Sequence, residues 1–303
     1  MDIGVVIGGG FRIIRDKPLA VLAWAIVFLL MLFPTLYLMR PMMEAQAQMQ
    51  AQVAANDPQA QLAAMGVMMG RLLLLFLMSL VVYVILFAAA QRAVLKPEQR
   101  GFFYIRLGMD ELRLLALSII FLVAYYVATL VLTVVLSILM AIVIGATGSA
   151  GAAAILSVAM IVALIAFTAF YYIRFGLAFP LTMLREKIVI GEAWRISRGR
   201  FWALFAASLV VVTIIAILWI AVTSVTSGAY FADVARNAGD PAAVQRLERA
   251  QVARELGFSV TSVVMWVGAA LAGALTVTLW GGSAATAVKQ LTFNPRDIAE
   301  TFA

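Results

Sequence analysis

The chain has no cysteine and no histidine among its 303 residues, and only 12% of its residues are charged. Without cysteine there is no disulfide, no thiolate ligand for a metal and no cysteine nucleophile. Without histidine the commonest general base and metal ligand are missing, which excludes a Ser-His-Asp triad and an HExxH zinc site. We therefore expect no catalytic residue, no cofactor and no metal site.

Apolar residues are in excess: 65% of the chain is hydrophobic and its mean hydropathy is +1.04. A soluble domain is roughly 45–50% apolar and about 25% charged, so a lipid bilayer is the expected solvent. A helix needs about 20 apolar residues to cross the hydrocarbon, where its backbone must satisfy its own hydrogen bonds. Six runs are long enough, namely residues 19–39, 72–90, 114–144, 152–173, 201–225 and 258–288. The predicted fold is an all-α integral membrane protein with six transmembrane helices, forming a single membrane domain over residues 1–303.

Basic residues are distributed unevenly between the expected spans. The segments on one side of the expected spans carry 16 of the 22 basic residues. Three lie before the first span, five between the second and third, six between the fourth and fifth, and two after the sixth. The positive-inside rule then predicts that both termini face the cytoplasm, in agreement with an even number of spans. The first run exceeds the usual core of a signal peptide and no small-residue cleavage site follows it, so we interpret it as a retained span, with a cleaved signal as the alternative.

An aromatic residue followed four positions later by arginine occurs three times before an odd-numbered span, at separations of 91 and 92 residues. The three pairs are Phe11/Arg15, Phe102/Arg106 and Trp194/Arg198. This spacing predicts three repeat-like units, residues 1–92, 93–184 and 185–288, followed by a cytoplasmic tail, residues 289–303. Each unit is expected to be a hairpin of two spans preceded by a short basic amphipathic interfacial helix, and the hairpins to pack around a pseudo-threefold axis. Chance spacing is the alternative.

The connections between the spans contain signals of their own. Asp57-Pro58 and Asp240-Pro241 predict helix starts, because Asp caps free N–H groups and Pro fits the first turn. Residues 44–52 and 242–256 are predicted to be solvated helical extensions, and residues 145–151 a plain turn. The last span is rich in small residues, which predicts a central packing helix, with a substrate-lined path as the alternative.

The segments before the odd spans place apolar residues on one helical face and arginines beside it. A basic amphipathic helix with an aromatic residue suits the headgroup layer, so contact with anionic lipid at the cytoplasmic face is the functional interpretation. The predicted lipid-contacting residues are Arg12, Arg15, Arg106, Arg195 and Arg198. Ordinary anchoring of the topology is the alternative. Membrane lipids are the expected partners, a nucleic acid is not, and the sequence points to no particular protein partner.

Arg174 is the one ionisable residue inside a continuous apolar stretch, residues 152–184. An ionisable group within a span is a functional candidate by default. At about 1.5 Å per residue it lies near the cytoplasmic interface, where an arginine can also extend its head group toward water. Both interpretations remain open from the sequence.

Residues 171–180, Glu186 and residues 191–202 (GEAWRISRGRFW) resemble a stretch of polytopic bacterial proteins similar to the membrane domain of glycerophosphodiester phosphodiesterases. The resemblance implies a helical membrane domain. Its signature positions would be Arg174, Pro180, Glu186, Arg198, Gly199 and Trp202. It does not imply the phosphodiesterase activity, which resides in a separate soluble barrel.

These observations favour a non-enzymatic, multi-pass protein of the bacterial cytoplasmic (inner) membrane that acts as a lipid-contacting scaffold or partner-binding factor. The alternative is a transporter or channel for a small or anionic solute. Acidic residues at depth, which cation-coupled transport usually needs, are missing from the expected spans. A water-filled cavity beside Arg174 would favour transport, and a dry bundle with a basic collar would favour the scaffold.

Overall fold

The computed structural model describes residues 2–54 and 58–292, and within these ranges all regular structure is helical. In chain order the elements are α1 (Ile3–Asp16), α2 (Pro18–Ala54), α3 (Pro58–Leu95), the 3₁₀ turn η1 (Phe102–Tyr104), α4 (Met109–Thr147), α5 (Ala150–Phe175), α6 (Ala178–Arg185), α7 (Ile190–Ser197), α8 (Phe201–Arg236), α9 (Pro241–Leu256) and α10 (Val260–Thr292). Six of them, α2, α3, α4, α5, α8 and α10, are long and apolar enough to cross a membrane. The predicted all-helical fold with six membrane-length helices is thus confirmed.

Several long helices continue beyond the apolar runs that predicted them. At about 1.5 Å per residue the 37 residues of α2 are roughly 55 Å long, well beyond the ~30 Å of hydrocarbon. The backbone over residues 44–52 is helical as expected, and α9 covers the other predicted extension. Asp240 caps α9, because its Oδ1 accepts from the amides of Ala242 and Ala243 at 3.0 and 3.1 Å. Asp57 lies outside the described residues, although α3 begins at Pro58.

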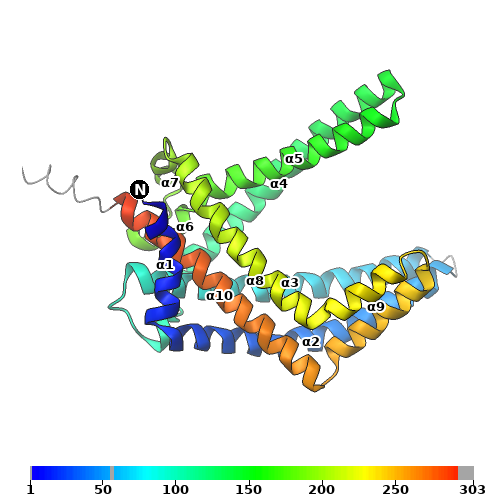
Figure 1. The fold of residues 1–303 in the computed structure, drawn as a ribbon, viewed down its shortest axis with the longest axis horizontal. Coiled ribbons are helices and arrows are strands. Elements are labelled where there is room, and N and C mark those ends of the chain that lie inside the picture. Colours follow the sequence, from blue (N-terminus) through cyan, green and yellow to red (C-terminus); the bar gives the residue numbers. More distant parts are fainter. Residues whose placement is uncertain (1, 55–57, 293–303) are drawn as a thin grey trace, which may run out of the picture.

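The helices gather at one end of the molecule and spread at the other. α1, η1, α6, α7 and the last turns of α10 lie together, and the buried side chains form three clusters there (Figure 1). This end is called the basic end below. From it the α4–α5 pair, which turns at left-handed Gly148, runs in a different direction from α2 and α3 (Figure 1). The most apolar windows of α4 and α5 contain no buried residue, so this pair of helices is covered by the rest of the described chain only at the basic end.

α10 is the packing centre of the fold, as its small residues predicted. It packs against α1, α2, α3 and α8. The approach to α1 is so close that a Cβ on Gly10 would lie 2.6 Å from the Cα of Leu279, and one on Gly282 would lie 2.8 Å from the Cα of Gly10. Only glycine permits two helix backbones to come this near, so the Gly8-Gly9-Gly10 run serves close packing from its second residue on.

One expectation about the repeat-like units is wrong. The segment around Phe102 and Arg106 is not an amphipathic helix, because Phe103 and Tyr104 take positive φ angles of 51° and 64° and end the 3₁₀ turn after three residues. The pseudo-threefold axis stays a prediction. The second helix of each hairpin packs against the first helix of the next, since α3 contacts α4, α5 contacts α8 and α10 contacts α2, whereas the contact of α10 with α3 has no counterpart of comparable extent among the described residues.

Candidate functional site

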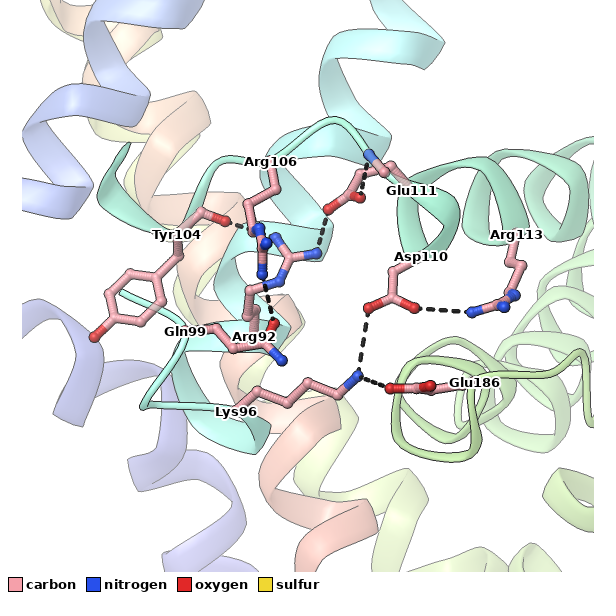
Figure 2. Close-up of polar contacts among 10 residues, drawn as sticks. Arg92, Lys96, Gln99, Tyr104, Arg106, Asp110, Glu111, Arg113 and Glu186 are labelled. Atoms are coloured by element: carbon pink, nitrogen blue, oxygen red, sulfur yellow. Dashed lines mark hydrogen bonds and ion pairs between the residues drawn. The ribbon is translucent and has the colours of Figure 1, made fainter. Parts of the chain in front are cut away.

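Arg92 and Glu111 form an ion pair that is almost fully buried at the basic end, with side-chain exposures of 2% and 7%. Arg92 lies near the end of α3 and Glu111 in the first turn of α4. Arg92 Nη2 donates to Glu111 Oε1, Arg92 Nη1 donates to the Tyr104 carbonyl at 2.7 Å, and Glu111 Oε2 accepts from the Gly108 amide at 3.0 Å (Figure 2). Buried charges are tolerated when they are paired and hydrogen-bonded in this way. The pair therefore ties the connection between α3 and α4 to both helices.

The strained turn between α3 and α4 is held by side chains of α2 and of Lys17, the residue just before α2. The Trp24 indole donates to the Phe103 carbonyl at 3.0 Å. Lys17 donates to the Ala93 carbonyl at 2.6 Å, and its ammonium lies 4.3 Å from the centre of the Tyr104 ring. Positive φ at a non-glycine residue persists only where the surroundings hold it. These contacts supply that restraint and direct the Tyr104 carbonyl at Arg92.

A second set of charges joins α3, α4 and the end of α6. Lys96 pairs with Glu186 at 2.9 Å and with Asp110 at 3.4 Å, and Asp110 also pairs with Arg113 at 3.1 Å (Figure 2). Glu186 ends α6 in a left-handed conformation with φ of 55°. Lys96 is 12% exposed and Asp110 17%, so this set lies at the boundary between the core and the surface. It fixes α6 against the connection between α3 and α4.

Arg174 is enclosed by aromatic rings of three helices. Its guanidinium carbon lies 5.5, 5.0 and 5.5 Å from the ring centres of Phe170, Trp194 and Phe201, and its Nη1 donates to Ser197 Oγ at 3.4 Å. These partners come from α5, α7 and α8. A guanidinium between aromatic faces is stabilised by the ring quadrupoles, and the contact is stronger away from water. Arg174 therefore holds α7 against α5 and α8.

The five arginines predicted to contact lipid are all exposed at the basic end. They are Arg12, Arg15, Arg106, Arg195 and Arg198. Arg12 donates to the Val5 carbonyl at 3.3 Å and Arg106 to Gln99 Oε1 at 3.2 Å. Within residues 2–54 and 58–292 none of the five forms an ion pair with a carboxylate. The structure does not bring them into one pocket, but it leaves their charges free toward the surroundings.

The signature positions of the resemblance have separate structural roles. Pro180 is buried in the first turn of α6, and α5 ends five residues before it because a proline clashes with the carbonyl four residues earlier. Gly199 has a φ of +79°, which favours glycine, in the turn between α7 and α8. Trp202 is 76% exposed at the start of α8. Glu186 binds Lys96, as described above.

A cavity of about 540 Å³ lies where α3, α4, α5, α8 and α10 diverge, and Phe179 of α6 also lines it. Half of its lining residues are aromatic, including Tyr83, Tyr172 and Trp280. Arg174 is not among the lining residues. In the described part of the chain no three Asp or Glu side chains gather so that they could hold a metal ion. Because half of its lining is aromatic, the cavity can accept an apolar group.

Sequence reasoning missed the Arg92–Glu111 pair and the aromatic cavity. Arg92 and Glu111 lie just outside the expected spans, 72–90 and 114–144. In the sequence they therefore contribute only to the net charge of the connection between these spans. No periodicity links them, because the partners are 19 residues apart and meet through the folded turn. The only available signal was their position at the two ends of one short connection.

The chain was also compared with protein-family models, with curated proteins and with solved structures, and none of the three comparisons finds a match. The resemblance to the membrane domain of glycerophosphodiester phosphodiesterases therefore rests on the stretch around residues 171–202 and stays a prediction.

Proposed function

We propose that this is a non-enzymatic protein of the bacterial inner membrane whose basic end faces the cytoplasm, contacts anionic phospholipid headgroups and serves as a scaffold or a partner-binding factor. One observation carries the proposal: four of the seven described carboxylates at the basic end are taken up by internal ion pairs, whereas five arginines there are exposed and have no carboxylate partner among the described residues. Asp110, Glu111, Glu186 and Glu192 are all paired with basic side chains. Each arginine near an anionic leaflet contributes about 1 kcal/mol to the attraction.

The distribution of charge along the chain supports the orientation. The segments before the odd-numbered spans and after the last span contain 16 of the 22 basic residues, 15 of them among the described residues, which is the asymmetry that the positive-inside rule associates with the cytoplasmic side. α1 and α7 fit the interfacial role, since each presents an exposed aromatic residue, Phe11 at 45% and Trp194 at 40%, close to its arginines. The second segment would contribute Phe102 and Arg106 from a turn.

The uncovered helices support the partner-binding half of the proposal. α4 and α5 expose large apolar side chains along most of their length, from Ile119 to Val143 and from Ile155 to Ile165. Transport of an anion past Arg174, the alternative, has less support, because its guanidinium is occupied by three rings and Ser197 and does not line the cavity.

The orientation is tested by labelling single engineered cysteines, which report cleanly because the chain has none of its own. Gly239→Cys lies at the opposite end and Lys187→Cys at the basic end, both exposed. In intact cells an impermeant maleimide is expected to label Cys at 239 and to reach the one at 187 only after the membrane is broken. The reverse pattern would refute the orientation.

Lipid contact is tested by replacing the five exposed arginines of the basic end by glutamine. The control replaces five arginines of the opposite end, Arg71, Arg236, Arg246, Arg249 and Arg254. We expect the first variant, and not the control, to co-purify with a smaller share of anionic phospholipid. An equal lipid complement in both would leave the arginines with a topological role only.

A further inference from the structure

We propose that the cavity between α3, α4, α5, α8 and α10 is a binding site for one acyl chain of a phospholipid from the leaflet at the basic end. This inference rests on the proposed lipid contact and specifies where the tail of such a lipid would lie. It is carried by the size, lining and depth of the cavity and by two unpaired hydroxyl groups within it.

The size and lining of the cavity fit an apolar ligand. Its volume of about 540 Å³ lies within the roughly 300–1,000 Å³ of typical small-molecule sites, which are mostly apolar with a few polar groups. Its walls are mostly leucine, valine, isoleucine and aromatic side chains from well-separated parts of the sequence, together with Ser118, Gly176 and Thr276. An apolar cavity does not hold water well, and it takes up apolar molecules instead. In a bilayer the surrounding apolar molecules are lipid tails.

The depth of the cavity matches the leaflet at the basic end. The α3 residues that line it lie between Leu80 and Phe87, which places them roughly 8–18 Å along the helix from Arg92. On α4 the lining begins at Leu114, one turn beyond Glu111. The buried ion pair therefore lies below the cavity on the side of the headgroups, and the cavity occupies the hydrocarbon directly above it.

Two tyrosines give the cavity hydroxyl groups that have no hydrogen-bond partner among the described residues. Tyr125 shares a hydrogen bond with Thr168 at 2.9 Å, and Tyr171 donates to the Phe121 carbonyl at 2.8 Å. Tyr83 and Tyr172, in contrast, are 39% and 52% exposed and line the cavity, and in the described part of the chain their hydroxyls form no hydrogen bond. A hydroxyl in hydrocarbon is costly without a partner. The ester carbonyls that join a lipid tail to its glycerol are acceptors of the required kind.

The unpaired arginines indicate the source of the chain. The basic end carries exposed positive charge without carboxylate partners among the described residues, so an anionic phospholipid is favoured there over a neutral lipid. Its headgroup would lie among these arginines while one tail enters the cavity.

The test fills the cavity from α8. Val212→Trp with Ile215→Trp places two large side chains into it, and Val210→Trp with Ile217→Trp is the matched control on the same helix outside the lining. Each protein is reconstituted in vesicles of equal parts phosphatidylglycerol and phosphatidylcholine, extracted in mild detergent and weighed by native mass spectrometry. We expect the wild type and the control to retain one phospholipid that the filled variant loses.

A second variant, Ser118→Phe, fills the same cavity from α4 and is expected to lose the same lipid, so that misfolding of the first variant does not decide the outcome. The double variant Tyr83→Phe/Tyr172→Phe is expected to release the bound phospholipid several-fold faster than the wild type. The inference is overturned if the filled variants retain the phospholipid as the control does, or if the retained molecule is not a phospholipid.

Failure of this inference and failure of the proposed function give different results. If the cavity is not a tail site, the filled variants keep all their lipid, and replacing the five arginines still lowers the anionic share. If the arginines do not select lipid, the glutamine variant keeps its anionic share, and the filled variants still lose one molecule.

Discussion

Arg92→Met is the most informative single change at the basic end, because it removes a buried charge and keeps an unbranched side chain. Glu111 would then be 7% exposed without its counter-charge, and the Tyr104 carbonyl would lose a donor at 2.7 Å. Breaking a buried pair by removing one partner costs about 3–5 kcal/mol, most of which is the penalty for the stranded charge. We expect a loss of this size in the free energy of unfolding.

The double variant Arg92→Met/Glu111→Leu separates the stranded charge from the value of the pair. Replacing both partners by apolar residues removes the buried charge altogether, and such replacements are often close to neutral. The hydrogen bond from the Gly108 amide to Glu111 Oε2 is lost as well, at about 1 kcal/mol. The double variant is therefore expected to be more stable than Arg92→Met alone.

The matched control is Arg236→Met, which breaks an exposed pair with Asp233 at 3.2 Å. With side chains 77% and 47% exposed, this pair contributes only about 0–1 kcal/mol. The measurement is equilibrium unfolding by sodium dodecyl sulfate in mixed micelles, followed by far-ultraviolet circular dichroism. If Arg92→Met costs no more than Arg236→Met, or if the double variant is the least stable of the three, the account of the buried pair is refuted.

Three smaller changes test the packing by the same measurement. Gly10→Ala should lower the free energy of unfolding by about 1–3 kcal/mol, because its Cβ would meet the backbone of α10. The control Gly8→Ala, whose Cβ would have no atom within 4 Å, should be neutral or stabilising. Equal effects of the two changes would contradict the close approach. Gly199→Ala should cost about 1 kcal/mol because φ there is +79°, and helical Gly191→Ala should not. Gln91 is fully buried and its side-chain amide has no hydrogen-bond partner among the described residues. Gln91→Leu should therefore stabilise the protein by about 1–3 kcal/mol. A loss of stability would show that the amide does form hydrogen bonds.

Much of the fold could be predicted because it depends on composition over long windows. A run of about 20 apolar residues has few alternatives to a membrane-length helix, since lipid offers no partner for backbone polar groups. The small residues of α10 likewise predicted its central place, and Asp240 predicted its cap. The ends of the helices were less predictable, because polar residues can extend a helix beyond the hydrocarbon without any apolar pattern.

The segment around Phe102 shows where local pattern is insufficient. Its apolar spacing suits a helix, yet Phe103 and Tyr104 take positive φ because Trp24 from α2 and Arg92 from α3 bind the carbonyls of the turn. Contacts across long sequence separations thus override the local preference. The threefold arrangement stays a prediction, and the contact of α10 with α3, together with the close approach of Gly10 to Gly282, is specific to one part of the fold.

The sequence by itself determined the class of protein, the number of membrane-length helices and the unequal distribution of charge, because each is a sum over many residues and tolerates local error. The tertiary structure alone decided which charges are paired. Arg92 and Glu111 bind each other, and Arg174 is enclosed by aromatic rings, while Arg12 and Arg195 stay exposed. From the sequence all five are simply charged residues on the same side of the expected spans. The cavity, too, exists only where side chains of six helices, α3, α4, α5, α6, α8 and α10, come together. Pairing and cavities are properties of distances between remote segments, which no single stretch of sequence contains.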